Sequence, residues 1–270
     1  MNIVTAFVSD INARPSRDLA KYVSYGKELL SLDLATTCFL ERSVFAEYFS
    51  DGMDTMSRFS YSARDFEYCI RGNTRFVMFE KTDLFLWPFR DLATKFELHT
   101  GNPQKDTLEY VFVQCQKVEW VCIAMELDRS LSDSKEYAWI DFGVFHMFGG
   151  NSDRFSSAMY AWRNRVQKRV LQEGASDRIR IAGCWDPQVN WSLDLYRDIY
   201  WVFAGSVFGG GCLAMKTFES TMRDTCIEIL RETGGLMWEV NVWVKIYREM
   251  PDLFSWYASD HTPILLDGYG

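Results

Sequence analysis

Residues 137–146, Tyr-Ala-Trp-Ile-Asp-Phe-Gly-Val-Phe-His, are the stretch that decides the predicted fold. A short apolar run leads to one carboxylate, Asp141, and Gly143 follows two residues later. This composition is typical of a buried strand whose end carries a polar side chain into a cleft. We therefore predict a strand over residues 137–142, with Asp141 at the carboxyl end, where α/β folds bind their ligands.

The chain around this strand is long enough to bury a large core. It has 270 residues, of which 48% are hydrophobic, and a formal net charge of -8. This charge argues against a nucleic-acid groove or a polybasic membrane patch. The seven cysteines are odd in number and form no Cys-x-x-Cys pair, which indicates reduced thiols. No stretch reaches the length of a membrane-spanning helix, so we expect a cytosolic (cytoplasmic) protein without a transmembrane segment.

Strands and helices alternate along the sequence. Residues 2–9 predict a strand, a helix capped by Ser16 runs to residue 30, and residues 34–40 predict a second strand. Strand, helix and strand at this spacing form a βαβ unit, which requires a parallel pairing. Residues 51–72 predict an irregular loop. Further strands are expected at 74–80, 178–182, 200–211 and 254–258, and further helices at 104–127, 153–171, 212–231 and 236–249. The predicted fold class is α/β, with a mainly parallel central sheet flanked by helices.

Asp141 has two interpretations when only its neighbours are considered. A single Asp can bind Mg²⁺ or Mn²⁺ together with phosphate oxygens and waters. Gly143 lacks a side chain, so a diphosphate or a sugar could approach the backbone there. Alternatively, Asp141 only caps the following turn through local hydrogen bonds to the backbone.

A resemblance to a known family favours the first interpretation. Five stretches occur in the order found in the HtrL/YibB-like family: NIVTAFVS, VQCQKVEWVCIAME, YAWIDFGVFH, WVFAGSVFGGG and WEVNVWVKIYREMPDLFSWYASDH. The resemblance covers nearly the whole chain, and the family looks like the GT-A-type glycosyltransferases. It implies a single GT-A-like, Rossmann-like domain over residues 1–270. Residues 1–145 would bind a nucleotide-sugar donor, and residues 146–270 would bind an acceptor. The implied reaction moves a sugar, most fittingly from a UDP-sugar, to a hydroxyl of a glycan.

The resemblance also implies a metal site. GT-A enzymes hold a metal ion and the donor diphosphate with an Asp-x-Asp motif, which matches Asp141-Phe142-Gly143 here without its second acidic residue. Asp141 therefore needs a further ligand for Mn²⁺ or Mg²⁺. The resemblance implies His261 for this role, with His146 as a second candidate. Alternatively, His261 is a loop histidine at the surface.

The donor-binding residues follow from the same resemblance. The residues Thr5, Ala6 and Phe7 would line the base pocket, and Arg14 would reach a phosphate. Gly205 and Ser206 would line the donor sugar. Lys117 lies in the helix before the Asp141 strand, and in similar enzymes a lysine there points toward the donor. A buried lysine needs a partner, so we expect a donor phosphate or Asp141 beside it, unless its ammonium group snorkels to solvent.

Glu239 is the candidate catalytic residue. It follows a double glycine and opens a predicted helix, in a position similar to the general base of many inverting GT-A enzymes. Such a base takes the proton from the acceptor hydroxyl. Alternatively, the helix dipole simply favours an acidic residue at this end. Trp238 would stack on the acceptor sugar, and Asp186 and Asp260 are reserve candidates for the base.

A non-catalytic carbohydrate- or nucleotide-sugar-binding protein on the same fold is the alternative function. The missing second acidic residue and the 16% aromatic content both allow it. A nucleotidyltransferase would need more acidic metal ligands or a glycine-rich loop with a lysine, and the sequence has neither.

Overall fold

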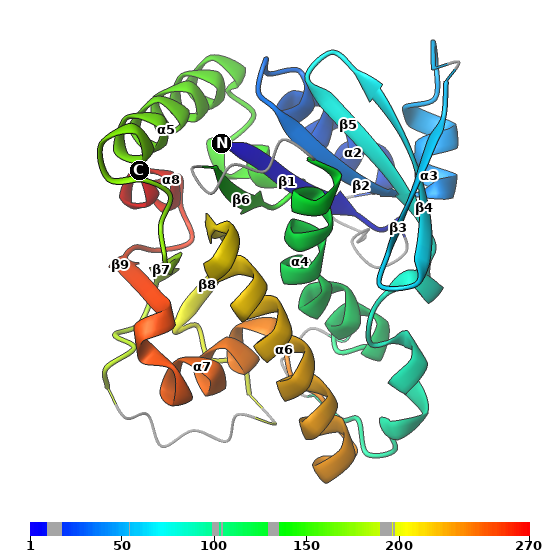
Figure 1. The fold of residues 1–270 in the computed structure, drawn as a ribbon, viewed down its shortest axis with the longest axis vertical. Helices are drawn as coiled ribbons and strands as arrows, with labels where there is room; N and C mark the ends of the chain where they lie inside the picture. The colour runs from blue at the N-terminus through cyan, green and yellow to red at the C-terminus, as the bar shows by residue number, and fades with distance from the viewer. Residues whose placement is uncertain are drawn as a thin grey trace.

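The computed structural model describes residues 1–9, 18–53, 55–98, 103, 105–128, 135–189, 196 and 198–270. Within these ranges the strands are β1 (Asn2–Phe7), β2 (Thr36–Glu41), β3 (Ser57–Tyr61), β4 (Arg64–Arg71), β5 (Thr74–Phe79), β6 (Glu136–Ile140), β7 (Ile179–Gly183), β8 (Phe203–Gly211) and β9 (Phe254–Ala258). They form one nine-stranded sheet in the order β3-β4-β5-β2-β1-β6-β8-β7-β9 (Figure 1). Both halves of the chain therefore contribute strands to the same sheet.

The sheet is mixed in direction. β5, β2, β1 and β6 run parallel in its centre, and β7 pairs parallel with β9. The other four neighbouring pairs are antiparallel, because β8 runs against β6 and β7, and β4 runs against β3 and β5. The prediction of an α/β fold is confirmed, but the sheet is mixed rather than mainly parallel.

The hairpin of β3 and β4 replaces the loop predicted over residues 51–72. Its two-residue turn, Ser62-Ala63, has positive φ angles of 48° and 62°. Two positive angles in a two-residue turn match the right-handed twist of the flanking strands. Asn-Gly or Asp-Gly is the usual sequence of such a turn, so Ser-Ala gave no hairpin signal.

The helices are α2 (Leu19–Leu30), α3 (Arg42–Tyr48), α4 (Leu108–Leu127), α5 (Ser152–Glu173), α6 (Cys212–Thr233), α7 (Glu239–Glu249) and α8 (Ile264–Tyr269). Four 3-10 helices accompany them: Lys81–Asp83, Trp87–Leu92, Val144–Phe148 and Pro251–Leu253. The side chain of Asp18 caps α2 by accepting the N–H of Lys21, whereas the predicted cap, Ser16, lies outside the described residues. No helix within the described ranges has both the length and the apolarity to cross a membrane.

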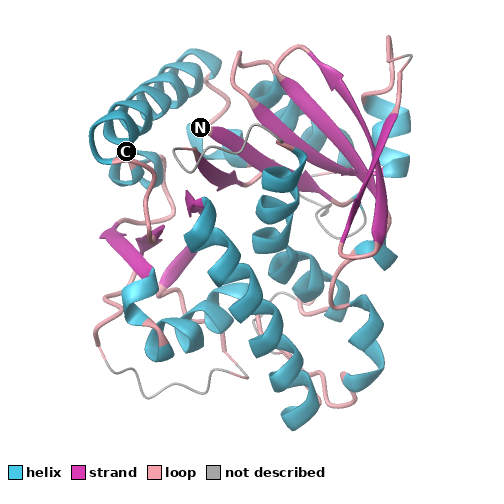
Figure 2. Cartoon of the chain, viewed as in Figure 1, coloured by secondary structure: helices cyan, strands magenta, loops and turns pink. Residues whose placement is uncertain are grey.

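The helices cover the sheet from both faces (Figure 2). α4, α6 and α7 pack on one face with alternate strand residues such as Val4 and Trp139. α2, α3, α5 and α8 pack on the opposite face with the residues in between, such as Ile3 and Ile140. This alternation follows from the period of two of a strand, and it decides which strand residues can reach α4.

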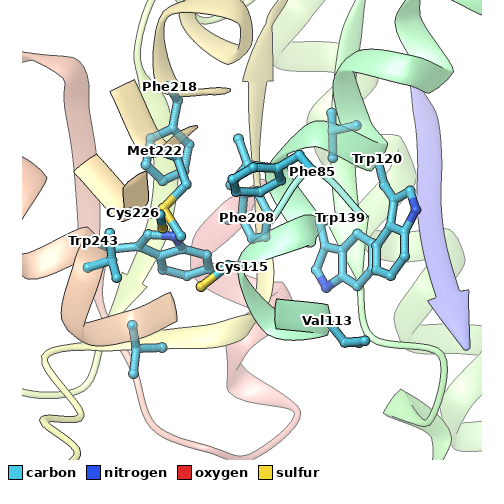
Figure 3. Packing of buried hydrophobic residues seen from close by; sticks show 14 of the residues in the cluster. Phe85, Val113, Cys115, Trp120, Trp139, Phe208, Phe218, Met222, Cys226 and Trp243 are labelled. Carbon is cyan, nitrogen blue, oxygen red and sulfur yellow. The ribbon is translucent and has the colours of Figure 1, made fainter. Parts of the chain in front are cut away.

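α4 is buried on all sides, because it lies between the sheet and α6 and α7. Every residue from 110 to 125 is buried. The indole rings of Trp120 on α4 and Trp139 on β6 stack at 5.8 Å (Figure 3). A helix that is apolar all round is a core helix, so its charged residues need partners. Glu119 finds them in Arg64 and Arg223, and Lys117 finds them at the candidate site.

Candidate functional site

The candidate site lies where the strand order of the sheet reverses. The chain extends from β1 to β2 and β5 on one side, and then returns to β6 on the other side of β1. Open α/β sheets bind ligands at such a switch point, outside the carboxyl ends of the strands. A cavity of about 270 Å³ lies there, between the ends of β1 and β6 and the helices α4 and α7.

The cavity brings together most of the residues predicted for the site. Its lining includes these predicted residues: Ala6, Phe7, Lys117, Asp141, Gly143, Gly205, Ser206, Trp238, Glu239 and His261. They come from β1, α4, β8 and α7 and from the segments that follow β6 and β9. Residues far apart in the sequence therefore converge on one hollow.

Three predicted residues within the described ranges, Thr5, Asp186 and Asp260, are not part of this lining. Thr5 is buried in β1 and does not line the cavity, although Ala6 and Phe7 do. Asp186 also lies outside the lining, and its Oδ1 accepts the backbone N–H of Gln188 in a turn. Arg14 lies outside the described residues.

The position of Asp141 follows from the alternation along β6. Tyr137 and Trp139 face α4, so the next residue on that side is Asp141. The indole N–H of Trp139 donates to Asp141 Oδ1 at 2.8 Å. The backbone N–H of Asp141 donates to the carbonyl oxygen of Ser206 at 3.0 Å. The side chain of Asp141 is 38% exposed and lines the cavity, and its contacts with Trp139 and Lys117 both use Oδ1.

Lys117 connects Asp141 to Glu239. Its Nζ lies 2.9 Å from Glu239 Oε1, 3.3 Å from Asp141 Oδ1 and 3.2 Å from the carbonyl oxygen of Gly205. An ammonium group has three N–H donors, and here three acceptors surround it. The side chain of Lys117 is only 6% exposed, so its ammonium group does not snorkel to solvent. It pairs with Asp141, as expected for a buried lysine.

Lys117 keeps its positive charge at neutral pH. Burial pushes the pKa of Lys117 down, but the carboxylates of Asp141 and Glu239 push it up by more. The pKa of Lys117 therefore lies above its ordinary value, and the group is an ammonium ion at neutral pH. Together with the two carboxylates it forms a cluster with a formal charge of -1.

Glu239 is the first residue of α7, and its side chain is 4% exposed. Lys117 holds its Oε1, whereas its Oε2 is buried and has no hydrogen-bond partner among the described residues. The neighbouring Trp238 has an unpaired indole N–H as well. A buried polar atom without a partner costs about 1–3 kcal/mol, so such atoms in residues that line a cavity indicate a place for a ligand.

The two glycines of the site make room for protein groups. A side chain at Gly205 would clash with Glu239 Oε1 and lie 3.3 Å from Lys117 Nζ. A side chain at Gly143 would lie 2.6 Å from the ring of Tyr22. Gly143 was predicted to let a donor approach the backbone, and Gly205 was predicted to line the donor sugar. Both line the cavity, and the space of an added side chain is occupied by Tyr22 at Gly143 and by the ion pair at Gly205.

Aromatic rings form the side of the cavity at the end of β1. Phe7 stacks on Phe142 at 5.0 Å and on Tyr22 at 5.5 Å. This wall lies where the nucleotide base was expected. At the opposite side, Trp238 is 4% exposed, with Tyr110 against it and Lys105 Nζ 4.9 Å from its ring centre. An acceptor sugar could stack on Trp238 only if Lys105 moved.

The residues that sequence reasoning missed share a pattern. Tyr110, Val113, Gln114 and Trp120 line the cavity from α4 together with Lys117. Their spacing of three and four residues places them on one side of a helix. The helical spacing around Lys117 could therefore have predicted all of these cavity-lining residues of α4. Tyr22 and Trp201 had no such signal, because only the packing of distant segments brings them in.

His261, the predicted partner of Asp141 in a metal site, lines the same cavity. Its ring packs edge-on against Trp201 at 4.6 Å, and its Nε2 lies 3.7 Å from Cys184 Sγ. Partial burial lowers the pKa of His261 below its ordinary value and outweighs the opposing effect of Asp260. The ring is therefore neutral at pH 7, as a metal ligand must be.

The described residues do not form a complete metal site by themselves. No group of three His, Cys, Asp or Glu side chains in these ranges could hold a metal ion. Mg²⁺ and similar ions, however, often bind through one or two carboxylates plus substrate phosphates and waters. Asp141 fits this kind of site, because Lys117 and Trp139 orient the carboxylate through Oδ1 and leave Oδ2 open.

Comparisons with protein-family models, with curated proteins and with solved structures found no match to this chain. The function proposed below rests on the geometry of the cavity and on the resemblance described above.

Proposed function

We propose that the protein is a glycosyltransferase that moves a sugar from a nucleotide-sugar donor to a hydroxyl of a glycan. A UDP-sugar is the expected donor. The observation that carries this proposal is the buried Glu239 on the cavity wall. Lys117 holds its Oε1, and its Oε2 has no partner in the part of the chain that the structure describes. Oε2 is buried, so it can accept a hydrogen bond, and then a proton, from a hydroxyl group once the side chain turns toward the cavity that it lines.

The arrangement of the central strands supports a nucleotide donor. β5, β2, β1 and β6 are parallel and have the spatial order 3-2-1-4, if the hairpin of β3 and β4 is set aside. This is the order of one half of the doubly wound sheets that bind nucleotides. A GT-A-like fold, with the nucleotide over the carboxyl end of β1, is consistent with that order and with the position of the cavity.

In the proposed reaction, the acceptor hydroxyl donates a hydrogen bond to Glu239 Oε2. Its oxygen attacks the anomeric carbon of the donor sugar while the proton passes to Glu239. The bond between the anomeric carbon and the phosphate oxygen breaks, and its electron pair leaves with the diphosphate. A single displacement of this kind inverts the anomeric configuration. Lys117 keeps Glu239 in place through Oε1, so that Oε2 is the atom that receives the proton.

Mn²⁺ or Mg²⁺ is part of the proposal. Asp141 and His261 would hold the ion, and the donor diphosphate and waters would complete its ligands. When bound, the ion would offset the negative charge of the leaving diphosphate. The charge of the site is in keeping with this need, because the cluster of Lys117, Asp141 and Glu239 already has a formal charge of -1.

We expect Asp141→Asn to lower donor hydrolysis by about 100-fold, because it removes the carboxylate proposed to hold the divalent cation. The measurement is the release of UDP from a panel of UDP-sugars, with Mn²⁺ and with a chelator. The wild-type protein should release UDP only with Mn²⁺. Asp153→Asn is the matched control, since this exposed residue of α5 lies outside the cavity lining.

The same assay separates the enzyme from a non-catalytic binding protein on the same fold. A protein that binds UDP-sugars but never releases UDP, with Mn²⁺ and a range of glycan acceptors present, would support the binding function. Equal release by the wild-type protein and Asp141→Asn would contradict the role of this carboxylate.

A further inference from the structure

The carboxylate proposed to hold a divalent cation already has a cation beside it. Asp141 Oδ1 lies 3.3 Å from Lys117 Nζ and also accepts the N–H of Trp139. Only Oδ2 remains for an added ion. Any such ion would bind to the second oxygen of a carboxylate whose first oxygen contacts an ammonium group.

We propose that Lys117 is an internal counter-ion that weakens the binding of free divalent cations to Asp141, so that the cation binds together with the donor diphosphate. This inference rests on the proposed function and concerns the regulation of the same site. It makes Lys117 a positioning residue with a second role, which is to tie metal binding to donor binding.

The ammonium group cannot easily avoid the added ion. Lys117 is buried, and its three acceptors come from β8, α7 and the end of β6. Repulsion between an ammonium group and a dication a few ångströms apart is strong in a poorly solvated site. The diphosphate supplies the negative charge that offsets this repulsion. Free Mn²⁺ should therefore bind weakly, and Mn²⁺ with a nucleoside diphosphate should bind well.

Glu239 acts in the opposite direction. Its Oε1 lies 2.9 Å from Lys117 Nζ and offsets part of the ammonium charge. Without the charge of Glu239, the three-residue cluster changes from a formal charge of -1 to zero. Without the charge of Lys117, it changes from -1 to -2. The two substitutions should thus shift the affinity for free Mn²⁺ in opposite directions, which a general loss of structure would not do.

The test is the binding of Mn²⁺, measured from the electron paramagnetic resonance signal of the free ion, with and without UDP. It uses the full chain as wild type, Lys117→Met, Glu239→Gln and Lys216→Met. Lys117→Met should bind free Mn²⁺ about tenfold more tightly than wild type, and Glu239→Gln should bind it more weakly. UDP should tighten Mn²⁺ binding by about tenfold or more in the wild type and by less in Lys117→Met.

Lys216→Met is the matched control for net charge. Lys216 pairs with Glu126 at the surface and lies outside the cavity lining, so its affinity for Mn²⁺ should equal that of wild type. If Lys117→Met does not fold, the double variant Lys117→Met/Glu239→Gln replaces it, because it leaves no buried carboxylate without a partner. It should bind free Mn²⁺ about tenfold more tightly than Glu239→Gln alone, and equal binding by these two variants would overturn the inference.

The inference is overturned if Lys117→Met binds free Mn²⁺ no more tightly than wild type, or if Glu239→Gln binds it more tightly. If the wild type still releases UDP from a donor in that case, only the role of Lys117 as a counter-ion fails. A wild-type protein that neither binds UDP nor releases it would contradict the proposed function, and the inference would fall with it.

Discussion

Glu239→Gln is expected to lower kcat for UDP release from the donor by about 10³-fold, while the affinity for the donor at saturating Mn²⁺ changes little. The amide can still accept the N–H of Lys117, so the shape of the site should persist. It cannot take a proton from the attacking hydroxyl, whether that belongs to a glycan or to water. The measurement is the rate of UDP release at saturating donor, together with KM.

Asp186→Asn is the competing variant, because Asp186 is a reserve candidate for the base. It does not line the cavity, and its Oδ1 binds a backbone N–H, so we expect kcat to stay within about threefold of wild type. A large loss of kcat in Asp186→Asn, with full activity in Glu239→Gln, would assign the role of general base to Asp186 instead of Glu239. A loss confined to KM would assign Glu239 to binding.

Lys117→Met is expected to destabilise the protein by about 3–5 kcal/mol, because it leaves a buried carboxylate without its partner. Glu239 is 3% exposed and cannot turn to solvent without repacking the start of α7. In a domain of this size the loss corresponds to a melting temperature lower by roughly 10 °C. Urea unfolding at pH 7 gives the free energy directly.

Two further variants separate this effect from a general loss of charge. Adding Glu239→Gln to Lys117→Met should restore part of the stability, since the unpaired carboxylate disappears. Lys245→Met removes an exposed pair with Glu249 on α7 and should cost less than about 1 kcal/mol. If Lys117→Met proves as stable as Lys245→Met, the ion pair of Lys117 with Glu239 does not stabilise the fold as its short distance indicates.

The part of the site that could be predicted lies on elements with a clear period. Trp139 and Asp141 are two residues apart at the end of a strand, so they share a face. The stripe of Tyr110, Val113, Lys117 and Trp120 has helical spacing, and it places the lysine on the same wall. Local patterns therefore sufficed to bring Lys117 and Asp141 to one cavity.

The remainder depends on packing between distant segments. The hairpin at 57–71 has an unusual turn, and β8 runs antiparallel to both β6 and β7, a direction that no local pattern encodes. The clash at Gly205 arises from Glu239, 34 residues later in the chain. Trp238 was predicted to stack on the acceptor sugar, but Tyr110 and Lys105 pack against its ring.

The central claim is that this cavity binds a nucleotide-sugar donor through Asp141 and a divalent cation. Its most direct test is the melting temperature of the wild-type protein and of Asp141→Asn with a panel of nucleotide sugars, each with and without Mn²⁺. A ligand at 100 times its Kd stabilises the native state by about 2.7 kcal/mol. We predict that at least one UDP-sugar raises the melting temperature of the wild type by roughly 5 °C, only with Mn²⁺, and leaves Asp141→Asn unchanged. If no nucleotide sugar shifts the melting temperature of the wild type under either condition, the claim is contradicted.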